Sequence, residues 1–344
     1  MKLARLLSPL ARGGIAAAMA ALGGCGLFPD LSSYGECASG AACGGGGGAT
    51  QSSSVTSGAS TSTAGTTAAS STSAASSSAS GMMDPCALTP TMHGSEGVHV
   101  VSAFPAFCID RTEVSVGQYR DFLENHVGND LLPSEFPLSC TWKTNAFAAF
   151  EPKGAGGMND YLWTHYDAKT KEDRPVQGVD WCDAQIYCLW AGKHLCRDNS
   201  GMGAIDSTGG PNVAWLKSGQ WYRACSGAAQ TNYGYGNTYD PTQCNTESMG
   251  DATENNPFKT TAVTLPATCK AAWPDGDVFD MNGNVMEWED NCEATGTPGP
   301  EDDTCYPRGG SYNLQQYTSC DFVDDNSPHR RDLKGEYLGF RCCW

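Results

Sequence analysis

The chain has 344 residues, and its 38 Asp and Glu residues outnumber its 21 Lys and Arg residues to give a formal net charge of −17. A surface this acidic repels nucleic acids and anionic lipid headgroups, so we expect no nucleic-acid partner. The charge is consistent both with plain solubility and with the binding of cations.

Residues 1–24 are predicted to be a signal peptide. Three basic residues within the first 12 precede an apolar run at 15–22, which is too short to span a bilayer as a mature helix. The Gly-Gly-Cys25 that follows resembles a bacterial lipobox and predicts diacylation of Cys25; the alternative is cleavage elsewhere, with Cys25 an ordinary residue. Gly26 resembles the outer-membrane sorting signal of Gram-negative lipoproteins. We therefore expect an exported chain that is anchored to the outer membrane by lipid attached to Cys25.

Residues 25–85 are predicted to form a disordered tether. From 26 to 83 the chain consists almost entirely of Ser, Thr, Ala and Gly, which offer too little apolar surface to offset the entropy of ordering. As a random coil, about 60 residues span roughly 40–45 Å. The tether therefore separates the membrane from a domain that we expect at residues 86–344.

The cysteines indicate disulfides rather than zinc. Lipidation of Cys25 would leave 17 − 1 = 16 cysteines, of which Cys37 and Cys43 lie in the tether and 14 lie between Cys86 and Cys343. Both subsets are even, and the chain has no CxxC or HxxxH spacing of the kind that zinc sites use. We expect the 14 cysteines of the domain to be paired, in a connectivity that the sequence does not specify.

Two helices are predicted within the domain. In VGQYRDFLEN, at 116–125, the apolar residues recur at helical spacing after Ser115, which is a suitable N-cap. A second helix is predicted at 181–191, where Asp180 is placed to cap it and Asp183 follows three residues later. The apolar residues of this second helix share one face.

Short apolar runs at 99–104 and 337–343 are typical of strands. Gly, Pro, Asn and Asp recur every few residues through most of the remaining domain. The predicted fold class is therefore α+β, with little regular secondary structure and many disulfides.

Six segments of the domain carry a recognisable pattern. They are FCIDRTEVSVGQY at 107–119, RPVQGVDWCDAQIYCLWAGKHLC at 174–196, GQWYRACSG at 219–227, FDMNGNVMEW at 279–288, RGGSY at 308–312 and LGFRC at 338–342. In this order they resemble the formylglycine-generating enzyme family, the sulfatase-modifying factors. The resemblance implies a single α+β domain, distantly similar to C-type lectins and often stabilised by calcium. Met286 replaces a usual tryptophan, and about 20 residues are inserted before Gln220, so a surface loop is expected to differ.

The resemblance also implies two calcium sites, built from the hard oxygen ligands that this ion requires. The implied ligands are the Asp280 side chain with main-chain oxygens of Met281, Gly283 and Val285 at one site, and Asn245 with the Thr246 carbonyl at the other. The spacing at 280–291 excludes an EF-hand. The alternative is an Asx-rich turn, in which the side chains at 280, 282 and 284 bond their own backbone.

Glu287 and Trp288 are predicted to anchor the core. A buried glutamate requires a partner, and Arg341 in the GFR segment is the candidate. We therefore expect a buried ion pair between Glu287 and Arg341.

The family's oxidase reaction converts a sulfatase cysteine into formylglycine with oxygen and copper(I), which two cysteine thiolates bind. The resemblance places these cysteines three and eight residues after the serine of the glycine turn, and counting from Ser311 gives Leu314 and Ser319. Cys320 lies one residue late, and the even number of cysteines predicts that it is bridged. We therefore expect no copper and assign no catalytic residue.

Two functions follow from these expectations. In the first, the domain lacks the copper-binding cysteine pair and is a binding or structural module, or has an altered activity, on a membrane-anchored lipoprotein; the sequence does not identify its protein or glycan ligand. The alternative is a divergent formylglycine-generating oxidase that acts on a sulfatase cysteine. The chain has no GxSxG motif, and its six histidines are scattered, so no other enzyme class is indicated.

Overall fold

The structure is a computed structural model that describes residues 86–89, 92–101, 105–153, 171–205, 213–247, 260–295, 299–323 and 329–344. These residues belong to one compact unit of the chain, 76–344. The predicted signal peptide and tether, including Cys25, lie outside the described residues. Within the described ranges, no helix combines the length and the apolar character that crossing a membrane requires.

Helices in the described ranges are short. The α-helices are α1 Val116–Asn125, α2 Phe147–Phe150, α4 Trp181–Trp190, α5 Val213–Leu216 and α6 Gln220–Ser226, and the 3-10 helices are η1 Pro133–Glu135, η2 Leu138–Cys140 and η4 Pro300–Asp302. Most of the remaining described chain is turn and loop, as the recurrent Gly, Pro, Asn and Asp residues predict.

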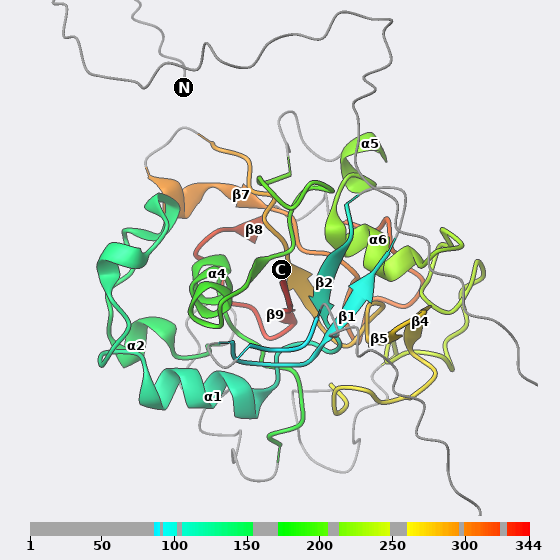
Figure 1. Cartoon of the computed structure of the whole chain (residues 1–344), viewed down its shortest axis with the longest axis horizontal. Helices are drawn as coiled ribbons and strands as arrows, with labels where there is room; N and C mark the ends of the chain where they lie inside the picture. The colour runs from blue at the N-terminus through cyan, green and yellow to red at the C-terminus, as the bar shows by residue number, and fades with distance from the viewer. Residues whose placement is uncertain are drawn as a thin grey trace, which may run out of the picture. The chain divides into compact units, whose positions relative to one another are not determined.

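Strands in the described ranges are also short and form several small sheets. They are β1 Gly97–Val100, β2 Phe107–Asp110, β3 His194–Leu195, β4 Lys270–Trp273, β5 Gly276–Phe279, β6 Met286–Trp288, β7 Thr304–Cys305, β8 His329–Arg330, β9 Leu338–Phe340 and β10 Cys342–Cys343. One sheet has the order β1-β2-β10-β3 with antiparallel neighbours; β4 and β5 pair antiparallel, β6 and β9 parallel, and β7 and β8 antiparallel. Figure 1 shows the C-terminus among these strands, beside β2 and β9.

The two strand predictions are correct in place and differ in extent. The strand predicted at 99–104 begins earlier, at Gly97, and residues 102–104 lie outside the described part of the chain. The strand predicted at 337–343 is divided at Arg341 into β9 and β10. The division has a physical reason, because β9 pairs with β6 whereas β10 pairs with β2 and β3 in another sheet.

Helix α1 confirms the prediction at 116–125. The Ser115 hydroxyl accepts a hydrogen bond from the Gln118 backbone N–H at 3.3 Å, and the Gln118 side chain accepts one from the Ser115 N–H at 2.9 Å. This capping box satisfies two N–H groups that a helix N-terminus leaves without partners. The buried face consists of Val116, Tyr119, Phe122 and Leu123. Except for Val116, these residues belong to a core cluster that also contains residues of α4 and β9.

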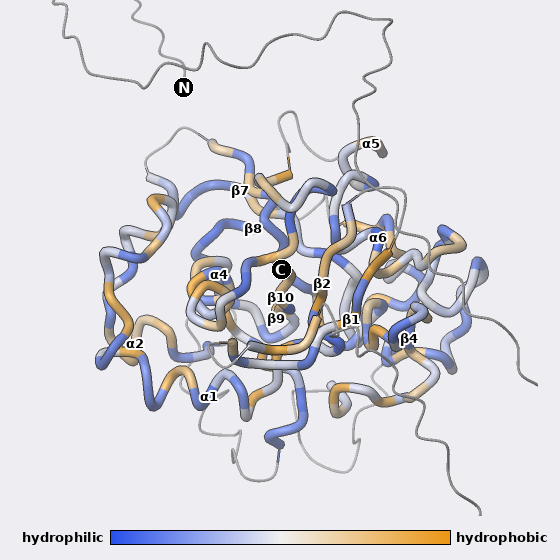
Figure 2. The backbone as a smooth tube through the Cα atoms, in the orientation of Figure 1, coloured by the Kyte–Doolittle hydropathy of each residue, from blue (hydrophilic) through white to orange (hydrophobic). Residues whose placement is uncertain are grey.

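Helix α4 confirms the second predicted helix, with the predicted cap at Asp180 and a reciprocal bond from Asp183. Its environment differs from the prediction of one apolar face, because every residue from 181 to 188 is buried. The polar side is buried because cations neutralise it. Lys143 lies 2.5 Å from both aspartates, and Lys334 lies 2.7 Å from Asp183. Figure 1 shows α4 end-on, with α1 and α2 to one side of it, and in Figure 2 α4 and β2 both carry hydrophobic stretches.

Seven disulfides confirm the prediction that the 14 cysteines of the domain are paired. The pairs are Cys86–Cys108, Cys140–Cys182, Cys188–Cys342, Cys196–Cys343, Cys225–Cys320, Cys244–Cys269 and Cys292–Cys305. Adjacent Cys342 and Cys343 tie the last strand to α4 and to Cys196 just after β3. The disulfides therefore replace part of the cohesion that longer helices and strands would supply.

Candidate functional site

The RGGSY turn is held in place by Arg308, whose side chain is fully buried. Its guanidinium donates a hydrogen bond to the carbonyl oxygen of Cys320 at 2.8 Å and lies 5.4 Å from the centre of the Trp221 ring. Gly310 has φ +66°, and a Cβ atom there would overlap the main chain at Tyr317. Arg308 and Gly310 therefore bring the two ends of the segment from Arg308 to Cys320 together.

Cys320 at the end of this segment forms a disulfide with Cys225 of α6, and both residues are fully buried. The Cys320 N–H donates to the carbonyl oxygen of Asn232 at 2.7 Å. The Asn282 side-chain nitrogen lies 3.5 Å from the Cys225 sulfur and 3.8 Å from the Cys320 sulfur. The predicted disulfide at Cys320 is confirmed.

Leu314 and Ser319 stand three and eight residues after Ser311, at the positions that the resemblance gives to the copper ligands. Their side chains are an alkyl group and a hydroxyl group. Leu314 is partly buried against the core cluster of α1 and α4. The Ser319 hydroxyl lies 2.8 Å from a carboxylate oxygen of Asp321. The Ser311 hydroxyl likewise lies 2.8 Å from the side-chain oxygen of Asn313. Neither Leu314 nor Ser319 offers the soft thiolate that copper(I) prefers.

The turn that follows β5 contains Asn282, whose amide bonds two distant segments. Its side-chain oxygen accepts from the Gly234 N–H at 2.8 Å, and its nitrogen donates to the Thr318 carbonyl oxygen at 2.6 Å. Asn282 is itself buried. These bonds link the loop after α6 to the segment that precedes Cys320.

Asn284 in the same turn makes a second set of distant bonds. Its nitrogen donates to Glu113 at 2.8 Å, and its oxygen accepts from the Thr261 N–H at 2.9 Å and from the Asn245 amide at 3.1 Å. The Asx-rich turn considered as the alternative at 280–284 is therefore wrong, because these side chains bond other segments rather than their own backbone. The turn joins several segments of the domain.

Asp280 begins this turn in the left-handed region, with φ +58°, and is buried. Its Oδ2 accepts from the Thr264 N–H at 2.6 Å, whereas its Oδ1 has no hydrogen-bond partner among the described residues. Burial raises the pKa of Asp280 to about 8. Burial, then Asp280, then Glu287 raise the pKa of Glu113 well above its ordinary value. The site therefore holds several buried carboxylates close together.

Arg341 is the buried cation of this group, and its predicted pairing with Glu287 is confirmed. Its Nε and one terminal nitrogen each lie 2.7 Å from a different oxygen of Glu287. The Trp221 indole N–H donates to the same carboxylate at 2.8 Å. One guanidinium thus faces the three buried carboxyl groups of Glu113, Asp280 and Glu287, and the raised pKa values of Glu113 and Asp280 favour their neutral forms.

The pair predicted for a second calcium site lies against the same turn. The Asn245 carbonyl oxygen accepts from the Asn284 N–H at 2.8 Å, and the Thr246 carbonyl oxygen accepts from the Gln315 N–H at 3.1 Å. The Thr246 hydroxyl lies 2.8 Å from the Tyr239 hydroxyl. The two predicted calcium sites therefore adjoin each other, because Asn284 links this pair to the turn that begins at Asp280.

A tyrosine-rich hollow of about 510 Å³ lies in the loop after α6, lined by residues 235–241 and 243. The rings of Tyr233 and Tyr235 stack with their centres 5.2 Å apart, and Tyr239 lies 6.0 Å from Tyr233. The Tyr233 hydroxyl donates to the Gln316 carbonyl oxygen at 3.2 Å. The hollow is therefore attached to the segment that follows the RGGSY turn.

Comparison with known families assigns the fold that these segments build. A family model described as "Sulfatase-modifying factor enzyme 1-like domain" matches residues 61–344. The chain belongs to this family. A protein from Bos taurus named "Inactive C-alpha-formylglycine-generating enzyme 2" is 25% identical over 253 residues, which are 67% of this chain and 69% of that protein.

Several solved structures are similar to this sulfatase-modifying-factor domain. CarF is 18% identical with a TM-score of 0.39, covering 73% of this chain and 96% of that one. Treponema denticola variable protein 1 is 17% identical with a TM-score of 0.39, covering 72% and 93%. PvdO from Pseudomonas aeruginosa is 14% identical with a TM-score of 0.38, covering 73% and 91%.

The sulfatase-modifying-factor domain fits a calcium ion at Asp280 in one respect. A buried carboxylate oxygen without a partner, beside further buried carboxylates, suits a hard divalent cation. No group of three or more His, Cys, Asp or Glu side chains in the described ranges is placed to hold a metal. The remaining ligands would therefore be main-chain oxygens, which the resemblance assigns to Met281, Gly283 and Val285. Both calcium sites stay predictions.

Sequence reasoning missed Glu113 and Glu289, both fully buried. Glu113 lies in the FCIDRTEV segment, where the alternation of charged and apolar residues resembles any exposed strand end. Burial raises the pKa of Glu289 to about 7, although Arg308 lowers it. Its Oε1 has no hydrogen-bond partner in the described part of the chain. The sequence signal was weak, because charge next to Trp288 could equally have faced solvent.

Glu289→Gln is expected to change how stability depends on pH. Because the folded state raises this pKa, it binds the proton more tightly than the unfolded chain does. The stabilisation is therefore complete below about pH 4.5 and is lost as pH rises through about 7. The full change is about 3 kcal/mol. Urea unfolding of both proteins should show the variant gaining stability relative to wild type between pH 5 and pH 8.

The matched control is Glu124→Gln, which removes a carboxylate from an exposed position on α1. Its stability difference from wild type should be nearly the same at pH 5 and at pH 8, since this side chain is exposed to water in the folded protein. Parallel curves for wild type and Glu289→Gln would show that Glu289 does not titrate in this range.

Proposed function

We propose that the chain is an exported lipoprotein, anchored to the outer membrane through Cys25, whose domain is a binding or structural module without copper chemistry. The observation that carries this proposal is the disulfide between Cys225 and Cys320. It leaves no free thiol in the segment that follows the RGGSY turn. Leu314 and Ser319, at the positions expected for copper ligands, support the same conclusion.

A second line of support comes from a relative. The similar protein from Bos taurus carries the word "inactive" in its name. A family that includes an inactive member tolerates the loss of chemistry while the fold persists. We place a protein or glycan ligand at the hollow of Tyr235 and Tyr239, since tyrosine offers a rigid apolar ring and a hydroxyl with little loss of entropy.

The alternative is a formylglycine-generating oxidase, and a direct assay separates the two. We expect no aldehyde when the mature chain is incubated with a CxPxR peptide, copper(I) and oxygen and the peptide is analysed by mass spectrometry. An active formylglycine-generating enzyme serves as the positive control. Aldehyde formed by this chain would establish the oxidase instead. Peptide mapping of the unreduced chain checks the premise, because alkylated Cys225 or Cys320 would contradict the disulfide.

Calcium is expected to stabilise the domain if Asp280 binds it. A ligand at about 100 times its dissociation constant stabilises the folded state by about 2.7 kcal/mol. For a domain of this size, that corresponds to a rise of roughly 5–10 °C in Tm. Differential scanning calorimetry with calcium and with a chelator measures the change.

Asp280→Asn should remove most of this response, since it takes the charge from the proposed ligand. Asp275→Asn is the control, because Asp275 is exposed and contacts only His99 at 3.3 Å among the described ion pairs. An equal rise in Tm for the two variants would place calcium elsewhere.

A further inference from the structure

A second hollow lies between the C-terminal end of α4 and the chain from Asp130 to Phe136. Its volume is about 390 Å³, which is within the range of small-ligand sites. Its apolar lining residues are Leu131, Phe136, Ile186 and Leu189, and they lie beside Asp130, Glu135 and Trp190. Leu189 is 40% exposed. The hollow shares no lining residue with the tyrosine-rich hollow.

Trp190 lines the hollow and is held by other aromatic side chains. The His93 ring stacks on it with 4.3 Å between ring centres, and His126 lies at 4.6 Å. The Phe122 ring of α1 lies 5.2 Å from Trp190 between ring centres. The indole therefore keeps a fixed position and can present its electron-rich ring system without loss of side-chain entropy when a ligand enters.

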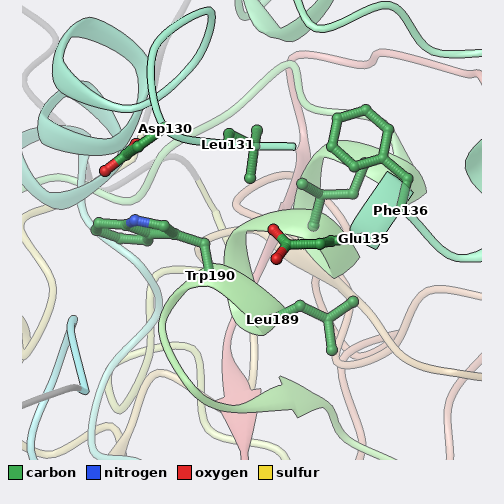
Figure 3. A pocket seen from close by; sticks show the side chains of 7 residues that line it. Asp130, Leu131, Glu135, Phe136, Leu189 and Trp190 are labelled. Atoms are coloured by element: carbon green, nitrogen blue, oxygen red, sulfur yellow. The ribbon is translucent and has the colours of Figure 1, made fainter. Parts of the chain in front are cut away.

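Two carboxylates stand at the rim of this hollow. Figure 3 shows Asp130 and Glu135 directed to the space beside the Trp190 indole. Asp130 is paired with His126, whose Nδ1 lies 2.9 Å from one of its oxygens. Glu135 forms no ion pair or side-chain hydrogen bond with any residue that the structure describes. The Glu135 carboxylate is therefore available to accept hydrogen bonds from a ligand.

The apolar residues, the Trp190 indole and the two carboxylates of this hollow together favour one class of cation. Among the described residues, Asp130 and Glu135 are the only acidic side chains that line the hollow, which is too few for a metal ion that needs about six or more oxygen ligands. A hydrated inorganic ion would also leave the apolar wall in contact with water. An amine or guanidine on an apolar body satisfies both surfaces, because its body covers the leucines and its charge lies between the carboxylates and the indole.

We propose that this hollow binds an organic cation, an ammonium or guanidinium group carried on a short apolar body. The cation lies between Glu135 and Trp190, with Asp130 adding negative charge, and the apolar body rests on Leu131 and Leu189. Such a group is found on free amines and on basic side chains of other proteins. The site is separate from the proposed ligand hollow at Tyr235 and Tyr239, so either proposal can fail without the other.

The test is a titration of the mature chain with phenethylammonium and with phenethyl alcohol, its neutral counterpart, by isothermal calorimetry and by NMR of the tryptophan indole N–H signals. A short capped peptide with one arginine between leucines forms the second arm. We expect phenethylammonium to bind and to shift the Trp190 signal, which Trp190→Phe identifies by its absence. Tighter binding of the peptide would identify a protein partner as the source, and tighter binding of the amine a free ligand.

Glu135→Gln should weaken phenethylammonium binding by about fivefold and leave the weak binding of phenethyl alcohol unchanged. Glu124→Gln is the matched control, because it removes the same charge from an exposed position on α1 outside the hollow. It should change the affinity by less than about twofold. Equal effects of the two variants would show attraction by net charge alone and overturn the proposal. Absence of binding for both cationic probes would also overturn it.

Discussion

Replacing Arg341 with methionine is expected to destabilise the domain by about 3–5 kcal/mol, the range for breaking a buried ion pair. Arg341 is fully buried and binds both oxygens of Glu287 at 2.7 Å. It also donates to the carbonyl oxygens of Asp110 at 3.2 Å and Phe279 at 2.8 Å. Methionine fills a similar volume and supplies none of these donors. Urea unfolding at pH 7 measures the loss.

The loss is large because Arg341 faces more than one carboxylate. It lowers the pKa values of both Glu113 and Asp280, which burial raises. Without the guanidinium, Glu287 must either keep an uncompensated charge in the core or take up a proton. Adding Glu287→Gln to the methionine variant removes that charge, so the double variant should recover part of the lost stability.

The control is Arg330→Met, which removes an ion pair of the exposed type. The Arg330 side chain is 56% exposed and lies 2.8 Å from both Asp302 and Asp332. Screening by solvent limits such pairs, so we expect a loss below about 1 kcal/mol. If the two arginine variants lost equal stability, the carboxylate group around Arg341 would not have the energetic importance that we assign to it.

The Glu287–Arg341 pair could be predicted from the sequence because burial of a charge requires a partner. The helix caps could be predicted for a related reason. Ser115 and Asp180 bond N–H groups of their own helices, so residues three apart in the sequence contain the whole interaction. Such interactions are predictable because they depend on residues a few positions apart, or because a buried charge requires an opposite charge.

The bonds of Asn282 and Asn284 could not be predicted, because their partners are far away in the sequence. Asn282 contacts Thr318, 36 residues later, and Asn284 contacts Glu113, 171 residues earlier. Local physics favours an Asx turn for such a pattern, and tertiary packing overrides it. The connectivity of the 14 cysteines could not be predicted for a similar reason. Their even number indicates that all are paired but does not indicate which pairs form.

The acidic rim of the organic-cation site is a third feature that could not be predicted from the sequence. In the sequence, Asp130 and Glu135 resemble a solvated loop, and both are in fact exposed. Their significance comes from Trp190, which lies 55 residues after Glu135 and reaches the same hollow from the end of α4. Family resemblance does not supply this contact, because Trp190 lies in the segment 174–196 whereas Asp130 and Glu135 lie outside every segment that carries the resemblance.

Replacing both Cys225 and Cys320 with alanine is expected to destabilise the domain by about 4–5 kcal/mol. The disulfide joins residues 95 apart, and opening a loop of that length returns about 4.7 kcal/mol of entropy to the unfolded chain. The Asn282 amide also loses two sulfur neighbours in the core. Urea unfolding at low temperature, with circular dichroism to verify the folded state, measures the difference.

The double alanine variant of Cys292 and Cys305 is the control, because that disulfide spans only 13 residues. The same relation gives about 3 kcal/mol for the shorter loop. A loss as large as that of the Cys225 and Cys320 variant would show that loop length does not govern the stabilisation by these disulfides.

The double alanine variant of Cys225 and Cys320 also tests the function of Cys320. If a chemical activity of the wild-type chain vanished in the double variant of Cys225 and Cys320 while stability changed little, the disulfide would be a reactive pair. A large loss of stability with no change in aldehyde formation would instead assign Cys320 to holding the RGGSY segment against α6.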